Sequence, residues 1–464
     1  MKRLSKNILL LFVSEAGSRL IGFFTTIYLA RNLSVDGFGI VNIGLTVFAY
    51  ALLFGSQWLN IYGTRQIAAG EKINFIGRFV SLRFVVSFIV FILTIILTYL
   101  FSEDTIIVFV IVLFVFSIFP NIFFLDLYFQ GKENLFPVSV GRLLISAVYL
   151  FSLLLFFSRS HNLTWVPASF LIGNTIGVAF VLYWFRKEGN TLVPSFSLKN
   201  SYSLFKKSLH LSSASVISQV NVNLPIIIIG LVLSATEAGI FSAASKLVFF
   251  FLLLDRFFYS LYFPAVTRVF QESSERLSEV VSFVLRIALI VIIPVTVGCI
   301  LLSEPIIRLI FGNDYQDASL VFQILIGYFT ATILNSIYGY GLVAIKQEKL
   351  YSKIIALSLI VYLFSTLIFT YLFGVIGTAA GVVVSEFVVL VCFRFAFGKF
   401  VQVNFFRYIL KVFPALLVMI IVIYFTSHNL LLSIPAAALT YLMITVAAGG
   451  ISKSDLQTLK EKIL

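Results

Sequence analysis

Charged residues are scarce in this chain of 464 residues. They make up 11% of it, against about 25% in typical soluble proteins, whereas 60% of the residues are hydrophobic and the mean hydropathy is +1.06. The polar side chains are too few to cover so much apolar surface in water, which excludes an ordinary soluble fold. We therefore expect lipid to be the solvent for most of the protein.

Cysteine and histidine are nearly absent. Cys299 and Cys392, the only cysteines, each lie within an apolar run, which excludes a disulfide framework and a cysteine-based metal site. The three histidines, His161, His210 and His428, fall near the ends of apolar runs and are expected to be interfacial rather than catalytic. We therefore predict neither a metal nor another cofactor. The net charge of +13 indicates basic cytoplasmic loops in such a protein, not nucleic-acid binding.

Apolar runs of about 20 residues, the length of a helix that crosses roughly 30 Å of hydrocarbon, recur along the whole chain. The predicted fold is therefore an all-α polytopic membrane protein with about fourteen transmembrane helices. These spans are predicted at residues 8–30, 38–60, 79–101, 105–129, 136–158, 164–185, 208–233, 238–263, 281–302, 318–344, 351–373, 377–398, 406–426 and 430–450.

Basic residues are unequally divided between alternate loops. With the N-terminus inside, 24 of the 33 lysines and arginines fall on inward loops and ends, and only Arg31, Arg159 and Arg308 fall on outward loops. Because basic loops stay in the cytoplasm, this bias predicts an N-in, C-in orientation. The outward loops are also too short to hold an extracytoplasmic active site, so we expect a protein that is not an enzyme.

The sequence contains an internal repeat. Residues 33–40 (LSVDGFGI) match residues 233–240 (LSATEAGI) at four of eight positions, and a fainter match pairs residues 133–135 with 348–350. Both matches occupy equivalent places in a six-helix unit, which predicts two parallel six-helix repeats plus two C-terminal helices. Transporters built from such repeats bind substrate in a central cleft and expose it to each side in turn.

This organisation divides the chain into four predicted parts. They are an N-terminal six-helix bundle (1–185), a cytoplasmic linker (186–207), a C-terminal six-helix bundle (208–398), and two extra helices with a cytoplasmic tail (399–464).

Three segments resemble a known family: residues 28–39, residues 130–133 (QGKE) and residues 238–247 (AGIFSAASKL). Together with the helix number and the duplication, they resemble polysaccharide-transport flippases of the Wzx type. That superfamily also contains the multidrug and toxin extrusion (MATE) transporters and the lipid II flippases. Members commonly have a proline in the first helix, whereas this chain has none before Pro120.

The resemblance implies a function and its partners. It implies translocation of undecaprenyl-pyrophosphate-linked oligosaccharide from the inner to the outer leaflet of the bacterial plasma membrane, for capsule or O-antigen-like polysaccharide. The partners it implies are the lipid-linked oligosaccharide and membrane lipid. A coupling proton or Na⁺ and the polysaccharide assembly machinery are further candidates.

Ionisable residues inside the predicted spans are candidates for the transport path, because a charge at the bilayer centre costs roughly 2.5–3.5 kcal/mol on insertion scales. Four lie near the middle of their spans: Glu15, Arg19, Lys246 and Glu386. Three lie in the inner third: Arg142, Asp255 and Arg256. Three others are close enough to the inner surface for their charges to reach it, and we discount them: Arg83, Asp126 and Arg286.

Sequence spacing suggests roles for these charges. Glu15 and Arg19, four residues apart, form either a self-neutralising pair or a cleft-lining pair in which Arg19 binds phosphate or a sugar carboxylate. Lys246 has no acidic residue within one turn, which favours a cation left free for an anionic ligand. Asp255 and Arg256 point about 100° apart and favour an interhelical ion pair. The excess of basic over acidic residues in the spans favours an anionic headgroup over a cationic drug.

The seventh predicted span is unusually polar. Its serines are followed by Gln219, Asn221 and Asn223, just before Pro225. These side chains either pack against a neighbouring helix or line a cleft wall that binds sugar hydroxyls, and Gln57 and Asn60 could do the same from the other bundle.

Two functions remain open. The first is the flippase, with Glu15 or Glu386 as candidates for binding the coupling ion. The alternative is a MATE-like cation-coupled multidrug exporter, which would favour acidic and aromatic cleft residues. A polytopic glycosyltransferase or polymerase is disfavoured because it needs a sizeable outer loop.

Overall fold

The structure is a computed structural model that describes residues 2–71, 74–193, 195, 198–270, 274–401 and 405–449. Side chains are described at all of these except 2–13, 74, 198–200, 213–215, 217–218, 222, 253, 256–261, 274–275 and 405–411. The predicted C-terminal tail beyond residue 449 lies outside this range. Within it, the chain forms helices and turns and no strand.

The chain divides into two compact units, residues 1–239 and 240–464. The helices of the first are α1 (Lys2–Asn32), α2 (Val35–Gly55), η1 (Gln57–Leu59), α3 (Asn60–Ala68), α4 (Asn74–Phe101), α5 (Thr105–Phe116), α6 (Ile118–Ile122), α7 (Asp126–Gly131), α8 (Phe136–Ser152), η2 (Leu153–Phe157), α9 (Ser158–Ser160), α10 (Trp165–Lys187) and α11 (Leu198–Val232). Those that follow are α12 (Ala235–Phe251), α13 (Leu253–Phe270), α14 (Ser274–Leu301), α15 (Ser303–Phe311), η3 (Asn313–Tyr315), α16 (Ala318–Ala344), α17 (Glu348–Gly398), α18 (Phe405–Thr426) and α19 (Leu430–Ala447).

Nine helical stretches among the described residues are long and apolar enough to cross a membrane. This confirms the predicted multi-pass helical membrane protein. One of the nine, α17, holds two predicted spans, 351–373 and 377–398, which are separated where Gly374 adopts a φ of 62°. That positive φ favours glycine, and it breaks the helix. The total of fourteen spans and the N-in, C-in orientation stay predictions.

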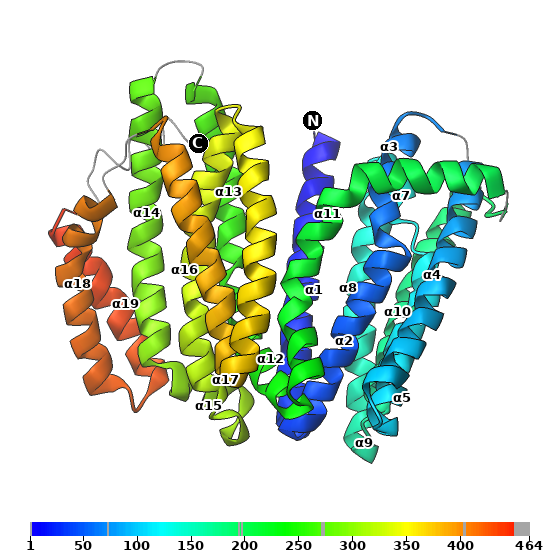
Figure 1. The fold of residues 1–464 in the computed structure, drawn as a ribbon, viewed down its shortest axis with the longest axis horizontal. Coiled ribbons are helices and arrows are strands. Elements are labelled where there is room, and N and C mark those ends of the chain that lie inside the picture. The colour runs from blue at the N-terminus through cyan, green and yellow to red at the C-terminus, as the bar shows by residue number, and fades with distance from the viewer. Residues whose placement is uncertain are drawn as a thin grey trace. The chain divides into compact units, whose positions relative to one another are not determined.

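In the first unit, α8 packs between α1 and α10, and α2 packs against α4 and α5. The core that α3, α4, α7 and α10 share is strongly aromatic. Phe79, Phe129 and Phe185 are completely buried in it. Helix α11 packs against η1, α2, α3 and α4 of this unit, and Figure 1 shows it crossing one end of the unit before it turns to run alongside α2. The sequence repeat predicts that residues 208–233 belong to the C-terminal bundle (208–398). The limits of the four predicted parts stay predictions.

The two matching turns of the sequence repeat have the same local structure. Ser34 caps α2 by accepting a hydrogen bond from Gly37 N at 3.1 Å, and Ser234 accepts one from Glu237 N at 3.2 Å. The turns also pack against each other, since Thr236 Oγ1 donates to Asp36 Oδ1 at 3.2 Å. The pairing of residues 33–40 with 233–240 is therefore seen in the structure as well as in the sequence.

In the second unit, α16 is central and packs against α13, α14 and α17. Helices α18 and α19 pack on each other and on α14 through an apolar cluster that includes Ile290, Met419 and Tyr441. The Tyr441 hydroxyl also donates a hydrogen bond to the Ile290 carbonyl at 2.9 Å. The two helices beyond the predicted repeats are thus anchored to the rest of their unit.

Candidate functional site

Two predicted spans of the first unit are broken at the same level, and the breaks expose backbone carbonyls. The second span changes from α2 to η1 at Ser56, whose φ is −148°. The fourth is divided into α5, α6 and α7, with Pro120 in α6 and non-helical backbone at residues 123–125. Interrupted backbone at membrane depth is tolerated only where other groups satisfy its polar atoms.

Arg83 of α4 donates hydrogen bonds to the free backbone carbonyls of the fourth span. Its Nη1 donates to the Ile122 carbonyl at 3.3 Å and to the Phe124 carbonyl at 3.2 Å, and its Nη2 lies 3.5 Å from Asp126 Oδ1. The side chain is buried, with the residue 1% exposed. The expectation that Arg83 reaches the membrane surface is therefore wrong. The reason is that the helix break provides acceptors inside the protein.

Side-chain hydrogen bonds also hold the break in the second span. Trp58 Nε1 donates to the Phe54 carbonyl at 2.8 Å, and the Trp58 carbonyl accepts from the Ser212 hydroxyl of α11. Asn60 Nδ2, at the start of α3, donates to Asp126 Oδ2 at 2.9 Å. Asp126 of the fourth span thus contacts Asn60 of the second span, and it also contacts Arg83 of α4.

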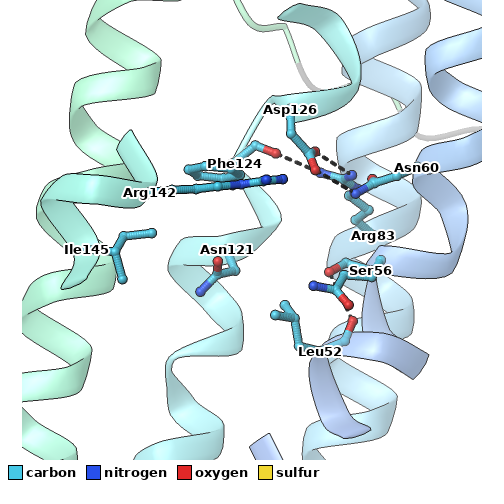
Figure 2. A pocket seen from close by; sticks show the side chains of 10 residues that line it. Leu52, Ser56, Asn60, Arg83, Asn121, Phe124, Asp126, Arg142 and Ile145 are labelled. Carbon is cyan, nitrogen blue, oxygen red and sulfur yellow. Dashed lines mark hydrogen bonds and ion pairs between the residues drawn. The ribbon is translucent and has the colours of Figure 1, made fainter. Parts of the chain in front are cut away.

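A cavity of about 140 Å³ lies between these breaks. It is lined by Leu52, Ser56, Gln57, Asn60, Arg83, Asn121, Phe124, Asp126, Arg142 and Ile145. Figure 2 shows the Arg142 side chain extending from α8 toward the Asp126 carboxylate on the opposite side. The Arg142 guanidinium makes no hydrogen bond or ion pair with any part of the chain that the structure describes.

The charges of this pocket do not cancel. Arg83 is neutralised by Asp126, so the half-buried guanidinium of Arg142 leaves the pocket with one net positive charge. Asn60 Oδ1 and Arg83 Nε are buried and have no hydrogen-bond partner among the described residues. The pocket can therefore take an anionic group at Arg142 and offers a hydrogen-bond acceptor and donors beside it.

The pocket brings together three of the predicted site residues, Gln57, Asn60 and Arg142. Glu15 and Arg19 lie on α1 and form the predicted pair, with Arg19 Nη2 2.9 Å from Glu15 Oε1 and both side chains more than a third exposed. Neither lines the pocket. Their role in a cleft stays a prediction.

The polar residues of α11 lie outside this pocket. Gln219 is exposed, and Asn221 and Asn223 are half-buried. The helix is fixed beside them by the Tyr50 hydroxyl of α2, which donates to the Val220 carbonyl at 2.6 Å.

The second unit holds a separate cluster of polar groups around Glu386 of α17. Glu386 Oε1 accepts from the Thr332 hydroxyl at 3.0 Å, and its backbone carbonyl accepts from Asn335 Nδ2 at 3.1 Å. Asp255 of α13 is near enough for the two carboxylates to repel each other. The side chain of Arg256 lies outside the described residues, so its predicted pairing is not seen.

Lys246 lies on α12 and is half-buried. Its ammonium group makes no hydrogen bond or salt bridge with any residue whose side chain the structure describes. Arg286 stacks on Phe283, with its guanidinium 5.7 Å from the ring centre. Across the described ranges, no group of three or more His, Cys, Asp or Glu side chains is arranged to hold a metal ion.

Arg83 and Asp126 are the pocket residues that the sequence interpretation discounted. Straight helices would place both residues near the inner surface. Pro120 was the one available signal, because a proline within a predicted span can interrupt the helix, and the free carbonyls of an interrupted helix need donors. Arg83, an arginine within a predicted span, was a candidate for such a donor.

A helical membrane protein with broken spans around a charged pocket has the architecture of a transporter. The chain belongs to the polysaccharide biosynthesis protein family, which it matches over residues 4–270. The resemblance to polysaccharide-transport flippases is thereby confirmed.

Similar proteins agree with this assignment. The chain is 24% identical over 258 residues to the probable low-salt glycan biosynthesis flippase Agl15 of Haloferax volcanii, a match that covers 53% of this chain and 55% of that protein. The match thus spans about half the length of that relative.

Two solved structures share the fold. An inward closed conformation of the lipid II flippase MurJ has a TM-score of 0.74 at 18% identity, covering 95% of this chain and 98% of MurJ. An inward-facing MATE family multidrug resistance transporter has a TM-score of 0.63 at 15% identity, covering 82% of this chain and 95% of that one.

Proposed function

We propose that the protein is a flippase for undecaprenyl-pyrophosphate-linked oligosaccharide repeat units. It moves them from the inner to the outer leaflet of the bacterial plasma membrane by alternating access, for capsule or O-antigen-like polysaccharide. The family assignment and the similarity to a protein named as a glycan biosynthesis flippase support this proposal. The transport step needs no covalent chemistry from the protein.

The unpartnered guanidinium of Arg142 in the pocket carries the proposal. A planar guanidinium matches two phosphate oxygens with parallel hydrogen bonds. Asn60 and Gln57 can hydrogen-bond the hydroxyl groups of a sugar next to the diphosphate. The cavity of about 140 Å³ has room for a phosphate group beside Arg142.

The test is headgroup translocation in proteoliposomes loaded with a lipid-diphosphate oligosaccharide. We expect Arg142→Gln to lower the rate about 10- to 100-fold, because a hydrogen bond to a charged group is worth about 1.5–3 kcal/mol. Arg142→Lys should retain part of the rate. Arg159→Gln, at an exposed arginine outside the pocket, is the matched control. Wild-type rates for Arg142→Gln would refute the role of this pocket.

We propose that the coupling ion, a proton or Na⁺, binds at the Asp255 and Glu386 carboxylates. Two carboxylates that repel each other bind a cation more readily than either does alone. The measurement is transport under an imposed proton or Na⁺ gradient. Glu386→Gln should remove the dependence on the gradient and leave headgroup binding intact.

The same carboxylates favour a MATE-like cation-coupled exporter as the second candidate function. Tyr328 of α16 lies close to both and supplies an aromatic ring beside them. Drug-efflux assays in a strain without its own exporters separate the two functions. Efflux that depends on Glu386 and not on Arg142 would favour the exporter.

A further inference from the structure

Helix α11 is longer than a membrane span requires. It has 35 residues, whereas about 20 cross the hydrocarbon core, which leaves roughly 15 residues or about 22 Å of helix. Figure 1 shows that this surplus lies at the N-terminal end, where α11 crosses one end of the first unit before it turns alongside α2. Residues 201–212 therefore form a helical segment that lies across the bundle.

One face of this segment is fixed to the unit. Ser201, Ser208 and Ser212 are buried, and they recur at the helical spacing of one face. On the same side, the Phe205 ring packs edge-on against Trp58, with ring centres 5.1 Å apart. The Ser212 hydroxyl donates to the Trp58 carbonyl. These contacts fix which residues of the segment point outward.

The outward side combines apolar and basic side chains. Tyr202 is 69% exposed and Leu209 is 50% exposed; being seven residues apart, they share one side of the helix. Lys206, four residues after Tyr202, lies next to them around the helix, and Lys207 points about 100° further round; both lysines are exposed. Large apolar side chains beside lysines are the pattern of a helix at the boundary between acyl chains and headgroups.

The positive charge of this segment has no partner among the described residues. The sequence has no acidic residue between Glu188 and Glu237. Lys206 and Lys207 form no salt bridge with the part of the chain that the structure describes. The described residues therefore supply no counter-charge to these lysines, and in a membrane the abundant nearby anions are lipid phosphates.

We propose that residues 202–209 of α11 form a docking surface for anionic phospholipid headgroups. Tyr202 and Leu209 insert between acyl chains, and Lys206 and Lys207 bind the headgroup charge. The predicted orientation places this segment at the inner leaflet. Because this binding is separate from the Arg142 pocket, it is measurable without any transport substrate.

Native mass spectrometry of the full-length protein in a neutral detergent tests this proposal. The protein is titrated with phosphatidylglycerol and, separately, with phosphatidylcholine of the same acyl chains. Each lysine near a headgroup contributes about 1 kcal/mol, so Lys206→Gln with Lys207→Gln should weaken phosphatidylglycerol binding roughly thirty-fold and leave phosphatidylcholine binding nearly unchanged. Tyr202→Ser with Leu209→Ser should weaken the binding of both lipids.

The control is Lys349→Gln with Lys353→Gln, which removes two exposed lysines from α17 and should keep the wild-type preference. A melting temperature checks that each variant is folded. If the double variant were unfolded, the single variants Lys206→Gln and Lys207→Gln should each weaken binding about five-fold. Equal binding of the two lipids by wild type, an unchanged preference in the α11 variants, or an equal loss in the α17 control would each overturn the proposal.

Discussion

Arg83 and Arg142 line one pocket, but their guanidinium groups have different surroundings. The guanidinium of Arg83 is buried and bound to two carbonyls and a carboxylate, whereas that of Arg142 makes no ion pair or hydrogen bond with the described residues. A buried charge with fixed partners holds structure together, and a charge without them is available to a ligand. We therefore expect Arg83 to contribute to stability and Arg142 to contribute to binding.

Removing Arg83 should destabilise the protein strongly. Arg83→Met leaves the Ile122 and Phe124 carbonyls without that donor and Asp126 without its countercharge, a loss of about 3–5 kcal/mol in the free energy of unfolding. Arg142→Met should change it by less than about 1 kcal/mol. Unfolding of the two purified variants in detergent measures this difference. Equal destabilisation by both substitutions would contradict it.

The double variant gives a sharper measurement of the ion pair. Arg83→Met with Asp126→Asn removes both charges, so no uncompensated charge stays buried. We expect it to be less destabilised than the sum of the two single variants by at least about 1 kcal/mol, because residues in direct contact are coupled. Additive losses would mean that the two side chains do not interact.

Asn60 lets the pocket's charge be changed at one position. Asn60→Ala removes the hydrogen bond to Asp126 and should slow headgroup translocation modestly. Asn60→Asp places a second carboxylate beside Asp126 and cancels the net positive charge of the pocket. We therefore expect a larger loss from Asn60→Asp than from Asn60→Ala in the proteoliposome assay. The reverse order would argue against an anionic ligand.

The two repeat-related turns pack closely against each other in the first unit. A Cβ atom on Gly39 would overlap the Ala235 carbonyl oxygen, and one on Gly239 would overlap the Val35 carbonyl oxygen. Only glycine allows the two backbones to approach so closely. The sequence match at these positions thus reflects a contact and not only common ancestry of the repeats.

Gly39→Ala should therefore lower stability. The added methyl forces the two turns apart, which typically costs about 1–3 kcal/mol in a packed interior. Gly22→Ala on α1 is the matched control, because no atom lies within 4 Å of its added methyl. Since alanine favours helix, Gly22→Ala should leave the melting temperature unchanged or raise it. A Gly39→Ala protein that melts like wild type would refute the close packing.

The helices were predictable, but the breaks within them were not. A span needs only about 20 apolar residues, so hydropathy locates α4, α8 and α16 without knowledge of their neighbours. The breaks at Ser56 and at residues 123–125 depend on donors from α4 and α11, which no local pattern shows. Asn60 and Arg142 were predicted as candidates because they are polar within a span, and their role in binding stays a prediction. Arg83 and Asp126 were discounted because straight helices would place them near the inner surface, and their partners on other helices leave no trace in the local sequence.

Orientation is a property of the whole molecule, and the bias of lysines and arginines predicts it. With the N-terminus inside and fourteen spans, Ala69 lies on an inward loop and His428 on an outward one. Replacing Cys299 and Cys392 with alanine gives a background without thiols, into which Ala69→Cys and His428→Cys are introduced singly; both positions are exposed.

A membrane-impermeant thiol reagent should label His428→Cys in intact cells and Ala69→Cys only after the membrane is opened. His428 follows the thirteenth predicted span. Because thirteen is odd, it lies on the opposite side of the membrane from the N-terminus. Labelling of Ala69→Cys from outside would reverse the predicted orientation. Failure of both positions to react in intact cells would mean that the number of spans between them is even. With the predicted number of spans before α11, labelling of Ala69→Cys from outside would also place the lysines of α11 at the outer leaflet instead of the inner one.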